Sequence, residues 1–269
     1  MSGNENRTEQ DQVVIRERRG DILWLTINRP EQRNAITRFV FEGLGDGLEI
    51  ANEDPTIRAV VITGIGNQAF SAGADLRANV SGSPFQFDFT KTGHPSVRYF
   101  MQSERCKVPI IARVNGHARA GGFALVCSAD LVVSVDHAEF GTPEAGIGIF
   151  PVMFIPYMLR ILPWKKVNEL VLTASPIDAA EAKDIGLVNY VVPEDELDAK
   201  VEWLIKRVVK NSPTAIRLGK SAMAMMKDMT LEQGFEFATK TFPLMTMTDD
   251  ANEGLTAFRE KRRPNWSRD

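Results

Sequence analysis

The sequence feature that most constrains the fold is a strand–turn–helix joint between Val108 and Asp130. An apolar run rich in β-formers leads into a turn with Gly121 and Gly122, and a helix-like segment of small and apolar residues follows. At a helix start, glycines let a substrate approach the backbone, and unpaired N–H groups favour a developing negative charge. The joint suits half of an oxyanion hole, although a double glycine alone is more typical of close packing between helix and strand.

A second glycine turn and a carboxylate add to this joint. Residues 59–64 form an apolar run of β-formers, and the small residues of 69–76 expose backbone amides after it. Glu144 follows Pro143 in a glycine-flanked turn after a further strand, 131–135. A lone turn carboxylate is usually solvated. Two amide-bearing turns beside one carboxylate suit proton transfer next to a carbonyl, in which the amides hold an enolate oxygen, so Glu144 is a candidate general base.

Alternating strands and helices predict an α/β fold for the first two thirds of the chain, and the remainder reads as helices alone. Two strands at 13–18 and 22–28 are expected to form a hairpin. Residues 77–97 are expected to form a long loop that covers a site or is a surface insertion. The expected divisions are a disordered N-terminus at 1–12, a core at 13–193 and a helical region at 194–269.

Composition excludes several function classes. A formal net charge of −3 gives no general footprint for nucleic acid, although a basic cluster lies at 259–263. No stretch reaches the length of a membrane span, and the polar first dozen residues lack an apolar signal segment. Cys106 and Cys127 lack C-x-x-C spacing and fit a reducing compartment. We therefore expect a cytoplasmic protein without nucleic-acid or membrane partners.

The sequence contains no motif for a cofactor, a metal or a nucleophile. The glycines fit neither G-x-G-x-x-G nor a phosphate-binding loop, and the lack of G-x-S-x-G leaves Ser71 without support as a nucleophile. His94, His117 and His137 stand in no metal-ligand pattern, so no metal is expected and each histidine is interpreted as incidental. Carboxylates and backbone amides remain as the groups for chemistry.

Five stretches, in order along nearly the whole chain, resemble the successive motifs of the enoyl-CoA hydratase/isomerase (crotonase) family. They are residues 28–35, 70–75, 114–122, 140–144 and 253–262. The resemblance implies a spiral of β-β-α units with a C-terminal helical trimerisation region, and a homotrimer or homohexamer. It also implies an acyl-CoA thioester as substrate, with coenzyme A entering as part of that substrate and no separate cofactor.

The resemblance assigns roles to particular residues. The amides of Ala74 and Gly121 would hold the thioester carbonyl, and Glu144 matches the second catalytic glutamate of the family. The residues that would contact CoA are Arg29 and Arg33 near its phosphates, Ala72 and Asp75 in the second glycine turn, and Phe258 and Lys261, which would reach a nucleotide bound to a neighbouring subunit. Cations suit phosphates on general grounds.

One departure from the family pattern bears on the reaction. Family hydratases carry a glutamate where this chain has Ala124, so one of two acids is retained. Hydration divides its proton transfers between two carboxylates, whereas a proton shift needs one, and the pattern therefore favours Δ3,Δ2-enoyl-CoA isomerisation. The alternatives are 2-enoyl-CoA hydration with a substitute acid such as Asp88 or Glu139, decarboxylation or hydrolysis of an acyl-CoA, and a non-catalytic acyl-CoA-binding or RNA-associated role.

Overall fold

The computed structural model describes residues 13–77 and 93–266. The expected disordered N-terminus at 1–12 and most of the loop expected at 77–97 lie outside these ranges. None of the helices in the described part is long and apolar enough to cross a membrane.

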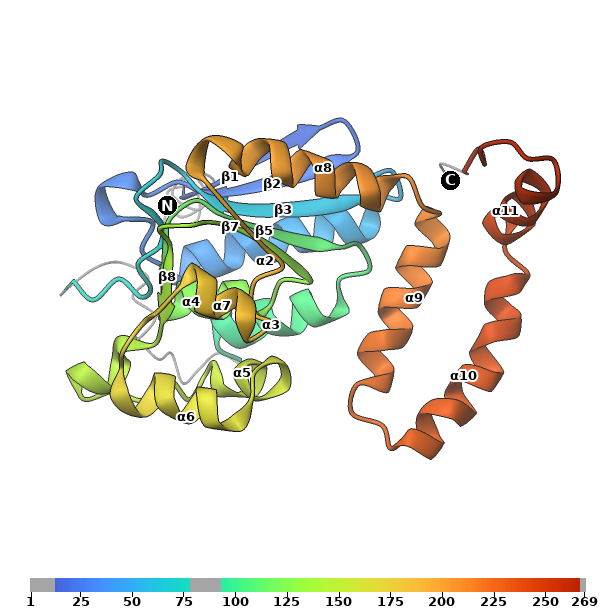
Figure 1. Cartoon of the computed structure of the whole chain (residues 1–269). Helices are drawn as coiled ribbons and strands as arrows, with labels where there is room; N and C mark the ends of the chain where they lie inside the picture. The colour runs from blue at the N-terminus through green and yellow to red at the C-terminus, as the bar shows by residue number, and fades with distance from the viewer. Residues whose placement is uncertain (1–12, 78–92, 267–269) are drawn as a thin grey trace, which may run out of the picture.

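A six-stranded sheet forms the centre of the fold (Figure 1). Its strands, in spatial order, are β1 (Val14–Arg19), β2 (Ile22–Ile27), β3 (Ala59–Gly64), β5 (Ile110–Val114), β7 (Leu131–Val135) and β10 (Tyr190–Val192). The first two strands pair as the expected hairpin, and every other neighbouring pair in this sheet is parallel. Strand β3 is buried along its whole length, which explains its continuous apolar run.

A second, smaller sheet carries the turns that matter for chemistry. It consists of β4 (Ala69–Ser71), β6 (His117–Arg119), β8 (Glu139–Gly141) and β9 (Ile177–Asp178), in that order. Each strand has two or three residues, too short for an alternating pattern to mark it in the sequence. The sheet brings the ends of three chain segments together, because β6 pairs with both β4 and β8.

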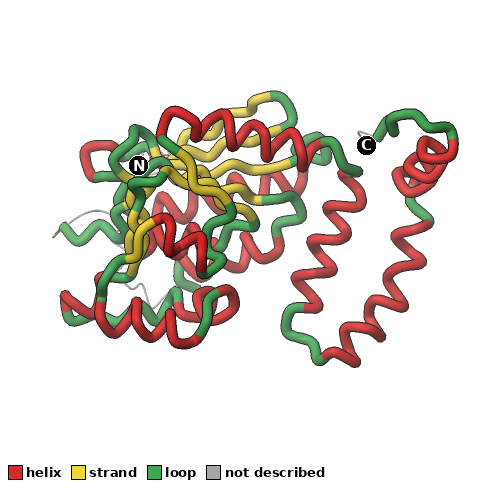
Figure 2. The backbone as a smooth tube through the Cα atoms, viewed as in Figure 1, coloured by secondary structure: helices red, strands yellow, loops and turns green. Residues whose placement is uncertain are grey.

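Helices cover both faces of the main sheet, as Figures 1 and 2 show. Helix α8 lies over one face, and α2 and α3 pack together under the other. The α-helices are α2 (Arg38–Glu53), α3 (Pro95–Arg105), α4 (Gly121–Cys127), α5 (Ile155–Ile161), α6 (Trp164–Thr173), α7 (Ala179–Asp184), α8 (Leu197–Val209), α9 (Pro213–Met226), α10 (Leu231–Thr246) and α11 (Asp249–Arg259). Short 3₁₀ helices span Pro30–Gln32, Pro143–Ile147 and Glu194–Glu196.

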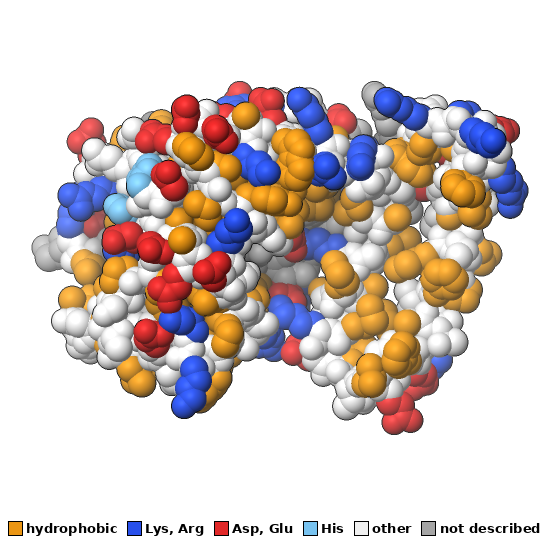
Figure 3. Space-filling model, in the orientation of Figure 1, with side chains coloured by type: hydrophobic (Ala, Val, Ile, Leu, Met, Phe, Trp, Pro, Cys, Tyr) orange, Lys and Arg blue, Asp and Glu red, His pale blue; other side chains and the backbone are white. Residues whose placement is uncertain are grey.

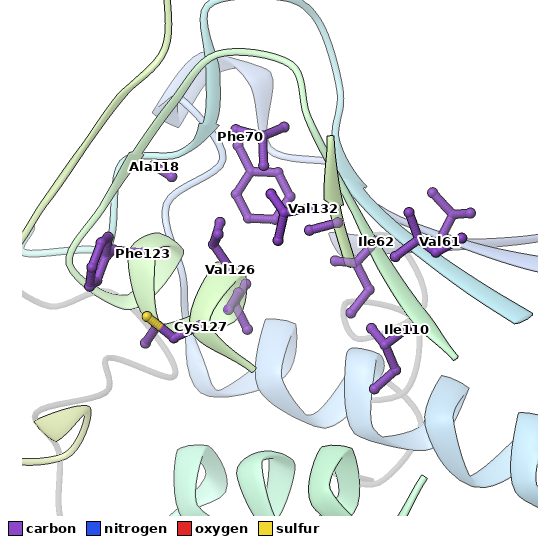
Figure 4. Close-up of a cluster of buried hydrophobic side chains, with 14 of the residues drawn as sticks. Val61, Ile62, Phe70, Ile110, Ala118, Phe123, Val126, Cys127 and Val132 are labelled. Carbon is purple, nitrogen blue, oxygen red and sulfur yellow. The ribbon is translucent and has the colours of Figure 1, made fainter. Parts of the chain in front are cut away.

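The core between the two sheets fixes helix α4. Buried side chains from β3 (Ile62), β4 (Phe70), β7 (Val132) and α4 (Phe123 and Val126) belong to one core cluster (Figure 4). All seven residues of α4 are buried. A fully buried apolar helix of this kind has little freedom to move, so it holds the turn at its start in place.

Helices α9 to α11 extend away from this body (Figure 2). Two cations on α9 anchor the extension. Arg217 donates to the carbonyl oxygens of Asp54 at 2.8 Å and Ile57 at 2.9 Å, just beyond α2. Lys220 is buried and donates to Asp130 at 2.5 Å. The α/β fold with a helical C-terminal region, expected from the sequence, is confirmed.

Sequence reasoning also missed the start of α3. Residues 95–97 were assigned to a loop, but α3 begins at Pro95 and buries Tyr99 and Phe100 against the core. Proline at the first helical position is favourable, because the N–H that it lacks would have no helical acceptor. The loop prediction was therefore wrong at its C-terminal end.

Candidate active site

The turn before α4 leaves one backbone amide without a helical acceptor. The N–H of Gly121 belongs to the first turn of the helix, where no intrahelical acceptor exists. Ala120 precedes it with φ +48 and ψ −119, a positive-φ conformation that is unfavourable for a residue with a Cβ atom. Strained backbone of this kind is often found where a site requires a particular peptide orientation. Here it sets the direction of the Gly121 amide.

The second turn aims another amide in a comparable way. Gly73 O accepts from Ile36 N at 2.7 Å, and Asp75 N donates to Ile36 O at 3.0 Å. Because N–H groups alternate in direction along extended backbone, the intervening amide of Ala74 points away from Ile36. Gly73 has φ +91, which an L-residue rarely adopts.

The two turns touch each other. A Cβ atom added at Gly73 would lie 2.5 Å from the Cβ of Ala120 and 2.9 Å from the carbonyl oxygen of Arg119. A Cβ atom added at Gly122 would lie 2.6 Å from the carbonyl oxygen of Ser71. Both glycines are required by this close approach, which brings the segments that carry the amides of Ala74 and Gly121 together.

Gly73→Ala should therefore lower the free energy of unfolding by about 2–4 kcal/mol, through left-handed strain and overpacking against Ala120. Gly66→Ala is a matched control, because Gly66 has φ +80 but nothing lies within 4 Å of an added Cβ atom. In Gly66→Ala the free energy of unfolding should fall through backbone strain alone, by about 1–2 kcal/mol. Equal losses in chemical denaturation would contradict the close contact between the turns.

Glu144 is a buried carboxylate without a hydrogen-bond partner on one oxygen. It is the second residue of the 3₁₀ helix Pro143–Ile147 and is 8% exposed. Its Oε2 atom is buried and makes no hydrogen bond. Burial raises the pKa of this carboxyl, opposed in part by a hydrogen bond from its own backbone N–H. A carboxylate in this condition is a stronger base than a solvated one.

Ala74, Gly121 and Glu144 line one pocket of about 320 Å³, which we call the apolar pocket. Its remaining wall is mainly hydrophobic, from Ile36, Phe41, Leu76, Ile147, Ile149, Phe150, Pro151, Val152, Met153 and Phe154. The residues that carry the two amides and the carboxylate therefore line the same pocket, in surroundings that strengthen electrostatic interactions. Such a pocket can bind an apolar group next to a carbonyl and move a proton beside it.

A second pocket, of about 850 Å³, adjoins the first and shares Ala72 with it. We call it the polar pocket. Its other lining residues are Arg33, Asn67, Gln68, Ala69, His117, Arg119, His137 and Glu194. Arginine side chains beside polar groups suit phosphate. A ligand with an apolar end and a phosphorylated end would match the two adjoining pockets, with its apolar end in the first and its phosphates in the second.

The remaining residues that the resemblance named lie outside these two walls. Arg29 and Asp75 form a buried ion pair behind the Ala74 turn, at 2.8 Å. Phe258, 84% exposed, and Lys261 lie at the end of α11 and line neither pocket. Ala124 is fully buried and is not among the residues that line the apolar pocket.

Of the two acids expected as substitutes for a second carboxylate, Glu139 lies within the described residues. Glu139 accepts from Arg119 at 2.5 Å and does not line the apolar pocket. Asp88 lies outside the described residues. Among the described residues, no group of three or more His, Cys, Asp or Glu side chains could hold a metal ion.

Sequence reasoning missed His94, which lines the apolar pocket together with Ser96. His94 caps α3: its Nδ1 atom accepts from Ser96 N at 3.3 Å and lies 2.6 Å from Ser96 Oγ. Accepting at Nδ1 leaves the proton of the neutral ring on Nε2. The signal in the sequence was Pro95, which marks a helix start and makes the preceding residue its cap.

Comparison with known proteins gives consistent matches over nearly the whole chain. The family model for enoyl-CoA hydratase/isomerase matches residues 17–269. Carnitinyl-CoA dehydratase from Salmonella arizonae is 36% identical over 257 residues, which cover 93% of this chain and 96% of that protein. The crystal structure of enoyl-CoA hydratase from Mycobacterium smegmatis has a TM-score of 0.88 at 31% identity, covering 94% of this chain and 98% of the other. Enoyl-CoA hydratase from Bacillus anthracis has a TM-score of 0.86 at 29% identity, covering 96% and 100%.

Proposed function

The chain belongs to the enoyl-CoA hydratase/isomerase family, and from that premise we propose that it transforms an acyl-CoA thioester through an enolate, with Glu144 as its single base. The observation that carries the proposal is the unpartnered, buried Oε2 atom of Glu144 in a pocket that two backbone-amide turns also line. We propose Δ3,Δ2-enoyl-CoA isomerisation as the reaction that this set of groups supports best.

The proposed steps use only these groups. Glu144 removes a proton from C2 of a 3-enoyl-CoA, and the electron pair of the broken C–H bond delocalises onto the thioester oxygen. The amides of Ala74 and Gly121 donate to that oxygen and stabilise the dienolate. Glu144 then returns the proton to C4, while the double bond forms between C2 and C3 and the carbonyl is restored. No atom is gained or lost.

The two pockets support a division of the substrate. The apolar pocket suits an acyl group without charge, because the described residues of its wall are hydrophobic or glycine apart from Glu144, His94 and Ser96. We propose that CoA phosphates bind toward Arg33 in the polar pocket, whose Ala72 wall continues into the apolar pocket. Phe258 and Lys261 are proposed to reach the nucleotide of a neighbouring subunit.

A second candidate is hydration or dehydration of an enoyl-CoA or its hydroxyacyl-CoA product. Relatives at 36% identity are named carnitinyl-CoA dehydratase, which favours it. A second proton-carrying group would then have to replace the carboxylate absent at Ala124, and His94 is a titratable side chain that lines the same pocket. Glu144 is the one carboxylate among the described residues that line the apolar pocket, and this makes isomerisation the first candidate.

A spectroscopic titration tests the proposed enolate chemistry without turnover. Acetoacetyl-CoA has an acidic C2 proton, and its enolate absorbs in the ultraviolet. Two aligned amides and a basic Glu144 should produce this absorption band on binding. The Glu144→Gln protein should bind the ligand without the band. A band of equal strength in both proteins would contradict the role of Glu144 as the base.

We further propose that the C-terminal helices pair with other copies of the chain. Helix α10 has no buried residue, and apolar side chains gather along this extension in Figure 3. The large exposed ones on α10 are Leu231, Phe235, Phe242 and Leu244. A face of this kind is seldom left open to water.

Sedimentation equilibrium should accordingly give a multiple of three subunits at micromolar concentration. Phe235→Glu should shift the protein toward smaller species, because a charge would be buried in the proposed contact. Leu172→Glu is the matched control, since Leu172 is similarly exposed but lies on α6. A stable wild-type monomer would contradict the proposed assembly.

A further inference from the structure

A buried ion pair lies directly beside Ala74. The Asp75 carboxylate accepts from Arg29 Nη2 at 2.8 Å and from Arg77 Nε and Nη2 at 2.9 and 2.7 Å. The side chains of Arg29 and Asp75 are 11% and 3% exposed, whereas that of Arg77 is 55% exposed. Arg29 is thus the buried partner of this carboxylate.

Arg29 also holds the chain segment that pairs with the Ala74 turn. Its Nη1 atom donates to the carbonyl oxygen of Ala35 at 2.5 Å. The next residue, Ile36, makes the two backbone hydrogen bonds that flank Ala74. One guanidinium therefore ties together both sides of the short ladder that sets the direction of the Ala74 amide. Bidentate use of arginine in this way gives geometric specificity as well as energy.

We propose that Arg29 and Asp75 are positioning residues that aim the Ala74 amide at the thioester oxygen. This inference rests on the proposed function of the apolar pocket. A donor stabilises an oxyanion only where it points at the developing charge, and a misplacement of about 1 Å can lower the rate about 10²-fold. Arg29 would then act on the chemical step and not on the phosphates of CoA.

Arg29 and Arg33 consequently have different roles, although only four positions separate them. Arg33 is exposed, has φ +50 and lines the polar pocket. The guanidinium of Arg29 faces Asp75 and Ala35 inside the protein. The two arginines can be distinguished by two substrates with the same acyl thioester, of which only one carries phosphates.

The first experiment compares Arg29→Met and Arg33→Met on two substrates. One is a 3-enoyl-CoA, and the other is the N-acetylcysteamine thioester of the same acid, which has no phosphate. Arg29→Met should lower kcat roughly 10–10²-fold on both, because the misplaced amide faces the thioester in each. Arg33→Met should mainly raise KM, and much more for the CoA thioester. An Arg29→Met effect confined to KM for the CoA thioester would overturn the positioning role.

Conservative variants give a second test that does not depend on Arg29→Met folding well. Arg29→Lys keeps the charge, which suffices for a phosphate, but one ammonium cannot reproduce the planar fork that joins Asp75 to Ala35. Its kcat should stay reduced. Asp75→Asn should also lower kcat. If Arg29 instead bound phosphate, this substitution would free its guanidinium from Asp75, and KM would fall. Wild-type kcat in both variants would overturn the proposal.

Two controls separate positioning from general damage and from failure of the proposed function. Arg113→Met removes a half-buried arginine that pairs with Asp198 at 2.6 Å, away from both pockets. It should match the Arg29 variants in thermal stability while keeping wild-type kcat. If Arg113→Met lost as much kcat as the Arg29 variants, the positioning role would be contradicted. Glu144→Gln reports on the proposed function itself. If Glu144→Gln is inactive while the Arg29 and Asp75 variants are normal, the positioning role alone is wrong.

Discussion

Glu144→Gln is expected to lower kcat for a 3-enoyl-CoA by roughly 10²–10⁴-fold, the usual loss when a general base is removed. The glutamine keeps the shape of the side chain and cannot accept the C2 proton. KM should change little, because Glu144 contributes to the chemical step and not to CoA binding. Activity within a few-fold of wild type would mean that Glu144 is structural.

The pH dependence provides an independent check of the same group. The base must be ionised, so wild-type kcat should rise with pH across a limb that lies above the ordinary glutamate range, because burial raises the Glu144 pKa. The stability of the fold changes with pH in the opposite direction. Because the carboxyl pKa is raised in the folded state, the free energy of unfolding falls as pH rises through that pKa. Glu144→Gln removes this ionisation. Its stability should therefore not decline over that pH window.

Ala124→Glu is expected to destabilise the protein by more than about 3 kcal/mol, as an unpaired charge in a buried site does. Ala124 is fully buried on a helix with no exposed residue. For a chain of this length, thermal unfolding should shift downward by about 10 °C. The loss should be larger at pH 8 than at pH 5, because acid neutralises the buried carboxyl.

Ala124→Gln is the matched control, with the same shape and no ionisable group. It should lose less stability, and the loss should not depend on pH over this range. If the Ala124→Glu protein kept the melting temperature of the wild type, the start of α4 would be accessible to the apolar pocket. A gain of 2-enoyl-CoA hydration would then be expected, because two carboxylates could divide the proton transfers.

Local signals allowed part of the site to be predicted from the sequence. Gly121 and Gly122 mark a strand–turn–helix joint, and the structure begins α4 at Gly121. The turn around Ala74 follows β3 as expected, and both amides line one pocket with Glu144. These features depend on short stretches of chain in which glycine, strand and helix preferences agree. The catalytic roles remain predictions.

Other features depend on contacts that no local pattern encodes. Arg29 and Asp75 are 46 positions apart, and only the fold reveals that they pair behind the Ala74 turn. His94 and Pro95 were assigned to the loop expected at 77–97, although His94 caps α3, Pro95 begins it, and His94 lines the apolar pocket. The burial of Ala124 also follows from packing around α4 and not from its own sequence.

The proposed isomerase activity can be tested by the rates of the wild-type protein on matched 3-enoyl-CoA and 2-enoyl-CoA substrates. With Glu144 as the one carboxylate among the described residues that line the apolar pocket, conversion of the 3-enoyl-CoA to the 2-enoyl-CoA should be much faster than hydration of the latter, and Glu144→Gln should abolish it. Hydration of the 2-enoyl-CoA on the order of 10³ s⁻¹, a rate typical of efficient enzymes, would contradict the account and show that another group supplies the second proton transfer.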